Sequence, residues 1–241
     1  MHTIKLSKFI YFITAATSFI CCSCANFGNY NKVPISLEDK RGYSYMQSGQ
    51  YQKAIDTFTQ IIAKSVDPYA YGYRGYAFSA LGEYQKAIDD CSQAIRLDPW
   101  EPLHRSTRGY AYEMLGDHQK ALDDFTQTIK VNPKDIVAYE YRGHINNELG
   151  KYQDGIKDYT EAIHIDPSRA ADWDHLGFAQ FQLGLYDQAL ESCNMAIKLS
   201  PLAGMYYYHR AKIYHTIKKH DLAEIDFQKA TRLGFVPGKA H

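Results

Sequence analysis

The chain has 241 residues, with 27 basic and 27 acidic side chains, so its formal net charge is zero. A neutral chain lacks the basic excess that nucleic-acid-binding proteins use to neutralise phosphates, and we therefore expect no nucleic-acid partner. Charged residues make up 22% and hydrophobic residues 45% of the chain, a balance typical of a folded body and not of a disordered one.

Residues 1–25 have the pattern of a signal peptide. Lys5 and Lys8 give a basic start, and residues 9–20 (FIYFITAATSFI) carry no charge. This stretch fits the apolar core of a signal peptide and is short for a membrane span. We therefore expect the body of the protein to be exported, with residues 26–34 as a polar tether.

The cysteines at the end of this segment leave its fate open. The run Cys21-Cys22-Ser23-Cys24 resembles the processing site of bacterial lipoproteins, in which a small residue precedes the cysteine that receives the lipid. Cys21, however, stands where that family prefers leucine. Lipidation at Cys24 implies an envelope protein, at the outer membrane or in the periplasm. Ordinary cleavage after Ala25 and an uncleaved anchor formed by residues 9–25 are the alternatives.

Residues 35–234 repeat a pattern with a period of about 34 residues. Each unit predicts two amphipathic helices of about 13 residues, because apolar residues recur at helical spacing. A glycine after the first helix and a proline after the second indicate where each helix ends. The six units are 35–67, 68–101, 102–135, 136–169, 170–203 and 204–234, and a short tail, 235–241, follows.

Small and turn-forming residues recur at fixed positions of these units. The early glycine of the first helix is Gly42, Gly75, Gly109, Gly143 and Gly177. The glycine at the turn is Gly49, Gly82, Gly116, Gly150 and Gly184. The closing proline is Pro99, Pro133, Pro167 and Pro201. This pattern resembles the tetratricopeptide repeat. The resemblance implies an all-α, right-handed superhelical solenoid of six helix-turn-helix hairpins. It also implies a concave face lined by the first helices, and a scaffold that binds proteins or peptides.

In four of the six units, arginine at position 7 occurs together with aspartate at position 23, whereas the first unit has Arg41 with Thr57. The four pairs are Arg74 and Asp90, Arg108 and Asp124, Arg142 and Asp158, and Arg210 and Asp226. The fifth unit has Leu176 and Ser192 and so lacks both charges. We predict a bidentate ion pair that joins the two helices of one hairpin. A binding site for a charged ligand is the alternative.

Positions 2, 5, 9 and 12 of each first helix lie on one stripe, since they are three or four residues apart. Aromatic rings recur at position 9, and three carboxylates, Asp39, Glu140 and Asp174, stand at position 5. Such a stripe suits a peptide groove, in which rings give contact area and acids recognise Lys or Arg. The predicted groove residues are Tyr43, Tyr76, Tyr110, His144, Phe178, Glu140 and Asp174. The alternative is that these rings pack against the first helix of the next unit.

No sequence motif for catalysis or metal binding occurs in the chain, so we expect no enzymatic activity, no cofactor and no metal site. The spacing of His209, His215 and His220 does not bring three ligands to one helical face. Cys91 and Cys193 occupy core positions three units apart and are expected to be buried free thiols.

The sixth unit departs from the pattern. Ala211 and Lys218 replace its two glycines, and no further helix is predicted after Leu233. Its last helix would therefore expose apolar surface, which suits a second copy of the chain or a partner. A self-assembling structural array is accordingly the alternative to a scaffold that binds a different protein.

Overall fold

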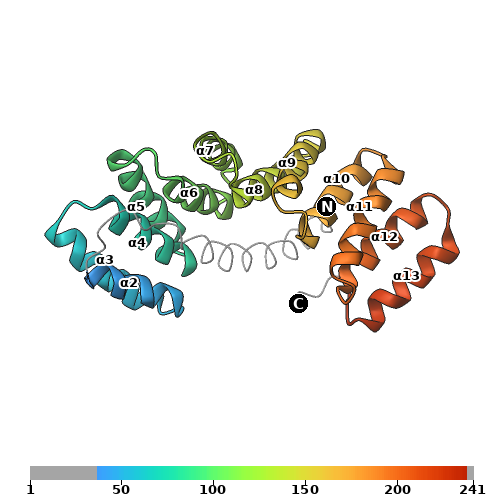
Figure 1. Cartoon of the computed structure of the whole chain (residues 1–241), viewed down its shortest axis with the longest axis horizontal. Coiled ribbons are helices and arrows are strands. Elements are labelled where there is room, and N and C mark those ends of the chain that lie inside the picture. The colour runs from blue at the N-terminus through green and yellow to red at the C-terminus, as the bar shows by residue number, and fades with distance from the viewer. Residues whose placement is uncertain (1–36, 238–241) are drawn as a thin grey trace. The chain divides into compact units, whose positions relative to one another are not determined.

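The computed structural model describes residues 37–237, and over that range the chain consists of helices and turns without a strand (Figure 1). Six hairpins follow one another, which confirms the predicted all-α repeat fold. They are α2 (Leu37–Gln47) with α3 (Tyr51–Lys64), α4 (Pro68–Ala80) with α5 (Tyr84–Leu97), α6 (Pro102–Met114) with α7 (His118–Val131), α8 (Ile136–Glu148) with α9 (Tyr152–Ile165), α10 (Ala170–Gln182) with α11 (Tyr186–Leu199), and α12 (Gly204–Thr216) with α13 (His220–Arg232).

The predicted signal peptide, the lipidation site at Cys24 and the tether lie outside the described residues, as do residues 238–241 of the tail. Among the described helices, none has the length and apolar character that crossing a membrane requires.

The described helices divide into two compact units between Ala138 and Tyr139. In the N-terminal unit, the helices of each hairpin pack against each other, and α4 also contacts the first helices α2 and α6. In the C-terminal unit, α10 packs against α9 and α11, and it also contacts α12. Within each unit, neighbouring first helices therefore form a continuous layer.

Glycine permits both the turn and the close approach within a hairpin. Gly82 adopts a φ of 78°, which residues with a side chain rarely adopt, and so ends α4. In the sixth hairpin Lys218 takes the same conformation, with a φ of 63°, at a higher backbone cost. A Cβ added at Gly75 would lie 2.7 Å from the Cys91 sulfur, so α4 and α5 approach this closely only with glycine there. Cys91 and Cys193 are buried free thiols, as predicted.

The structure brings together all four predicted Arg–Asp pairs. Nε and Nη2 of Arg108 donate to the two carboxylate oxygens of Asp124 at 2.8 and 2.7 Å. This geometry joins α6 to α7, and it recurs for Arg74 with Asp90, Arg142 with Asp158 and Arg210 with Asp226. Both partners are largely buried, with side-chain exposures of 21% for Arg108 and 6% for Asp124. A largely buried bidentate pair of this kind fixes the register of the two helices.

The same arginine also bonds to the preceding hairpin, a contact that the sequence did not predict. Nη1 of Arg108 donates to the Ser92 hydroxyl at 3.0 Å, and Nη1 of Arg74 donates to that of Thr59 at 3.0 Å. In the C-terminal unit, Nη1 of Arg210 donates to the side-chain oxygen of Asn194 at 2.6 Å. One guanidinium therefore links three helices, two within its own hairpin and one from the hairpin before it.

Replacing Arg108 with methionine should destabilise the protein by about 2–3 kcal/mol, because Asp124 is left buried without its cation. Urea denaturation followed by circular dichroism measures the loss. The matched control is Lys120→Met, which removes an ion pair with Asp117 whose lysine side chain is 60% exposed. The control should leave the unfolding midpoint unchanged, since exposed pairs contribute little. Equal effects of the two substitutions would contradict the role given to Arg108.

Candidate functional site

Two of the predicted groove rings are packed inside the array. Tyr76 is 2% exposed and Tyr110 is 7% exposed. The Tyr110 ring meets that of Tyr84 edge to face, with centroids 6.2 Å apart, and burial raises the pKa of its hydroxyl. Tyr84 begins the second helix of the preceding hairpin. The prediction that Tyr76 and Tyr110 line an open groove is therefore wrong, because little of either ring is left for a partner.

The other three aromatic positions of the predicted groove remain half-buried, namely Tyr43, His144 and Phe178. Phe178 meets Tyr152 of the preceding hairpin edge to face at 6.3 Å, which repeats the Tyr84–Tyr110 arrangement. The Tyr43 hydroxyl accepts a hydrogen bond from exposed Gln47 at 2.7 Å. These residues keep part of their surface accessible to a partner.

The predicted acidic residues contact basic side chains of the chain itself. Asp174 is 1% exposed, and its carboxylate lies 2.8 Å from Nδ1 of His209 in the next first helix. Glu140 is half-buried and pairs with Arg169, which also pairs with Asp172 at 3.1 Å. The prediction that Asp174 offers a free carboxylate to a partner is therefore wrong, and Glu140 offers one only in competition with Arg169.

Asp172 is a residue of this cluster that the sequence analysis missed. It occupies position 3 of the fifth unit, where the second and fourth units carry Ala70 and Ala138. This change from alanine to aspartate is the feature of the sequence that could have pointed to Asp172. Burial raises the pKa of the Asp172 carboxyl, and the neighbouring Glu140 raises it further, whereas Arg169 opposes both effects. Asp172 and Glu140 therefore form a pair of carboxyl groups beside a single guanidinium.

The raised pKa of Asp172 predicts a pH-dependent stability. The unfolded chain releases this proton near pH 4, whereas the folded chain keeps it to higher pH, so rising pH favours unfolding by at most about 1.4 kcal/mol per pH unit. Asp172→Asn removes this dependence and should gain stability over the wild type from pH 5 to pH 8, as urea denaturation at each pH would show. Asp187→Asn, at an exposed aspartate of α11, is the control. A constant difference between Asp172→Asn and the wild type at every pH would contradict the assignment.

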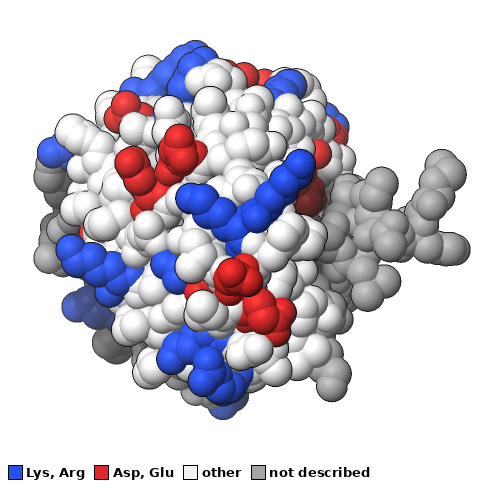
Figure 2. Space-filling model, turned by 90° about the vertical axis from the view of Figure 1, so that its right-hand side faces the viewer, with Lys and Arg blue, Asp and Glu red and all other residues white. Residues whose placement is uncertain are grey.

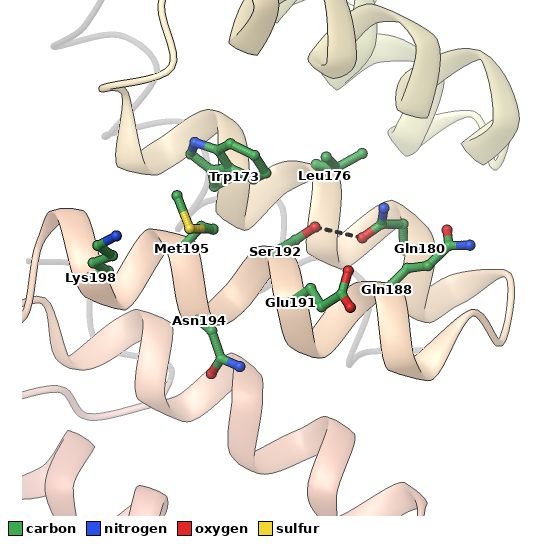
Figure 3. Close-up of a pocket in the computed structure, with 9 residues that line it drawn as sticks. All are labelled: Trp173, Leu176, Gln180, Gln188, Glu191, Ser192, Asn194, Met195 and Lys198. Carbon is green, nitrogen blue, oxygen red and sulfur yellow. Dashed lines mark hydrogen bonds between the residues drawn. The ribbon is translucent and has the colours of Figure 1, made fainter.

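A hollow of about 600 Å³ lies between α10 and α11, on the C-terminal unit (Figure 3). It opens beside Leu176 and Ser192, the two residues that replace the Arg–Asp pair in the fifth hairpin. The Ser192 hydroxyl donates to the side-chain oxygen of Gln180 at 2.7 Å and is thereby occupied. The residues that line the hollow are Trp173, Leu176, Gln180, Gln188, Glu191, Ser192, Asn194, Met195 and Lys198.

The surface at α13 carries side chains of both charges. Figure 2 looks onto this face and shows basic and acidic side chains interspersed among uncharged ones, without a broad patch of either sign. Apolar side chains of α13 are also accessible, since Leu222 is 43% and Ile225 is 58% exposed. This face therefore suits a partly apolar protein contact better than a polyanion.

Repeated hairpins with a shared turn, a shared close approach and a shared ion pair define a helical-hairpin repeat protein. The chain belongs to the tetratricopeptide-repeat family. Family models described as "Tetratricopeptide repeat" match residues 39–65, 68–100, 107–170 and 206–233, which together make up more than half of the chain. Among curated protein sequences, none matches the chain.

Solved structures with the same fold include bacterial repeat proteins. A crystal structure of MamA is 21% identical, covers 66% of this chain and 94% of its own, and has a TM-score of 0.64. MamA 41-end from Desulfovibrio magneticus RS-1 is 20% identical, with coverages of 70% and 97% and a TM-score of 0.67. YrrB, described as "a TPR protein with an unusual peptide-binding site", is 17% identical, with coverages of 73% and 91% and a TM-score of 0.65. Identities this low establish the fold alone.

Proposed function

We propose that the protein is a non-enzymatic scaffold that binds a partner protein or peptide. The observation that carries this proposal is the array of tetratricopeptide hairpins itself, because proteins of this family generally act through interactions and not through catalysis. The description of YrrB as a peptide-binding protein of the same fold supports a peptide or protein ligand.

The proposed contact surface is narrower than the stripe that the sequence predicts. Each unit offers a surface of its own, which is half-buried Tyr43 in the N-terminal unit and, separately, half-buried His144 and Phe178 in the C-terminal unit. Rings of this kind supply contact area at a low cost in side-chain entropy. Glu140 can add polar recognition of a basic side chain where a partner displaces Arg169.

Phe178→Ala should weaken binding of the partner by about tenfold or more, because truncating an interface aromatic commonly costs this much. The full-length chain, cross-linked in its own cells, identifies the partner, and titration of that partner measures affinity. Leu183→Ala is the control, since Leu183 is 42% exposed and lies in a turn away from the stripe. Unaltered affinity in Phe178→Ala, with unaltered circular dichroism, would count against this surface.

A self-assembling array is the second candidate, and the exposed Leu222 and Ile225 of α13 favour it. Self-assembly predicts that cross-linking captures only further copies of the chain. It also predicts that Leu222→Gln with Ile225→Gln turns the assembly into monomers in light scattering. Capture of a different protein by the double variant as well as by the wild type would favour the scaffold.

We further propose that the body is exported and held at a membrane through its N-terminus, with a lipid on Cys24. The basic start, the uncharged stretch of residues 9–20 and the small residue before Cys24 support this. Growth with a palmitate analogue should label the wild type, and Cys24→Ala should lose the label. Cys21→Ala and Cys22→Ala are matched controls that should keep it. Labelling that persists in Cys24→Ala would exclude this anchor.

A further inference from the structure

We infer that the hollow of the fifth hairpin binds one large apolar side chain of an uncharged, extended segment of a partner protein. The inference deepens the proposed scaffold function and rests on it, because it names the chemistry that one surface recognises. The hollow lies wholly within the C-terminal unit, between α10 and α11 (Figure 3).

The hollow is present because the fifth hairpin lost its ion pair. In the first helix of the sixth hairpin, Arg210 lies between the rings of Tyr207 and Tyr214, each 5.7 Å from the guanidinium carbon. That guanidinium also bonds to Asp226 and to Asn194 of the hairpin before it. Leu176, at the equivalent position, is shorter and makes none of these bonds. A side chain from another protein can therefore enter where the other hairpins place their own arginine.

Apolar atoms form the base of the hollow. The Met195 side chain on α11 points toward Trp173 on α10 (Figure 3), and Leu176, which is 7% exposed, lies one turn further along α10. The Trp173 indole donates from Nε1 to the Pro167 carbonyl at 3.0 Å and packs against the core cluster of Ala196, so its position is fixed. A preformed apolar base favours an aliphatic or aromatic guest, because burying such a side chain removes its surface from water.

The hollow does not suit a charged guest. Ser192 replaces the aspartate that neutralises arginine in four other hairpins, and its hydroxyl is already bonded to Gln180. A cation or an anion placed there would be desolvated without a partner at the base, which is unfavourable. The rim carries one acid, Glu191, and one base, Lys198, so it favours neither sign.

The rim suits the backbone of an extended peptide. Gln188 is exposed at the edge of the hollow, and its amide can both donate to and accept from a peptide unit. Leu176 and Asp174 are two residues apart on α10, so they point about 200° away from each other around the helix. The hollow and the first-helix stripe are therefore different surfaces, and a partner can occupy one without the other.

The test uses the chemical shift of the Trp173 indole N–H in the full-length chain. The chain has two tryptophans. Trp100 serves as the internal control, because it is 74% exposed and lies far from Trp173 in the sequence. The probes are four end-capped peptides, Ac-Ser-Asn-X-Asn-Ser-NH2, in which X is Leu, Phe, Ser or Arg. With X as Leu or Phe, the Trp173 signal should shift and saturate with a Kd of roughly 1–10 mM, as expected for one anchored side chain. The Trp100 signal should not move.

Two variants separate occupancy of the hollow from loss of fold. Leu176→Arg with Ser192→Asp restores the ion pair of the other hairpins, so it should fill the hollow, keep the circular dichroism spectrum and abolish the shift. Met195→Ser removes one apolar wall and should weaken binding of the Leu peptide several-fold without filling the space. Retained binding in both variants would overturn the inference.

Three other outcomes would also overturn it. Equal shifts with Ser and Leu show that no apolar anchor is recognised, and a stronger effect of Arg shows a cation site. A Trp173 shift on dilution of the protein alone assigns the hollow to a second copy. A failure of the inference about the hollow can be distinguished from a failure of the scaffold function. A partner bound on the first-helix stripe still binds the double variant Leu176→Arg with Ser192→Asp.

Discussion

The stacking of this chain depends on a guanidinium that recurs in four of its described hairpins. Arg108 bonds through two nitrogens to Asp124 in its own hairpin and through the third to Ser92 in the hairpin before it. Because a single rigid group makes all three bonds, the register within a hairpin and the stacking of successive hairpins are fixed together. The early glycine makes this possible by letting the two helices approach to contact, as Gly75 does at Cys91.

The fifth hairpin lacks both the arginine and the aspartate, and it departs from the pattern on two faces. On one face Leu176 and Ser192 replace the ion pair and leave the hollow. On the other face Asp172 and Asp174 are buried carboxyl groups, which Arg169 and His209 contact. Repeat arrays bind partners through residues that vary against a constant framework, so a hairpin that departs from the framework is where specific recognition is expected.

The sequence predicted the hairpins and the four ion pairs because both partners of each pair recur with the period. It missed the third bond of Arg74, Arg108 and Arg210, because the acceptor changes from Thr59 to Ser92 to Asn194 and so carries no single-residue signal. The sequence also predicted more exposed rings in the groove than the structure has, for a different reason. The exposure of a ring at position 9 depends on which side chain of the preceding hairpin packs against it, as Tyr84 packs against Tyr110. The Asp174–His209 contact, across 35 residues, likewise needed the three-dimensional stack.

Native-state hydrogen exchange of the full-length chain tests most directly whether the arginine holds the hairpins together. It reports the free energy of opening for each helix separately. We expect amides of α10 and α11, which no arginine joins to each other, to exchange through openings of lower free energy than those of α6 and α7, which Arg108 joins. Equal or greater protection of α10 and α11 would show that the arginine does not hold the hairpins together.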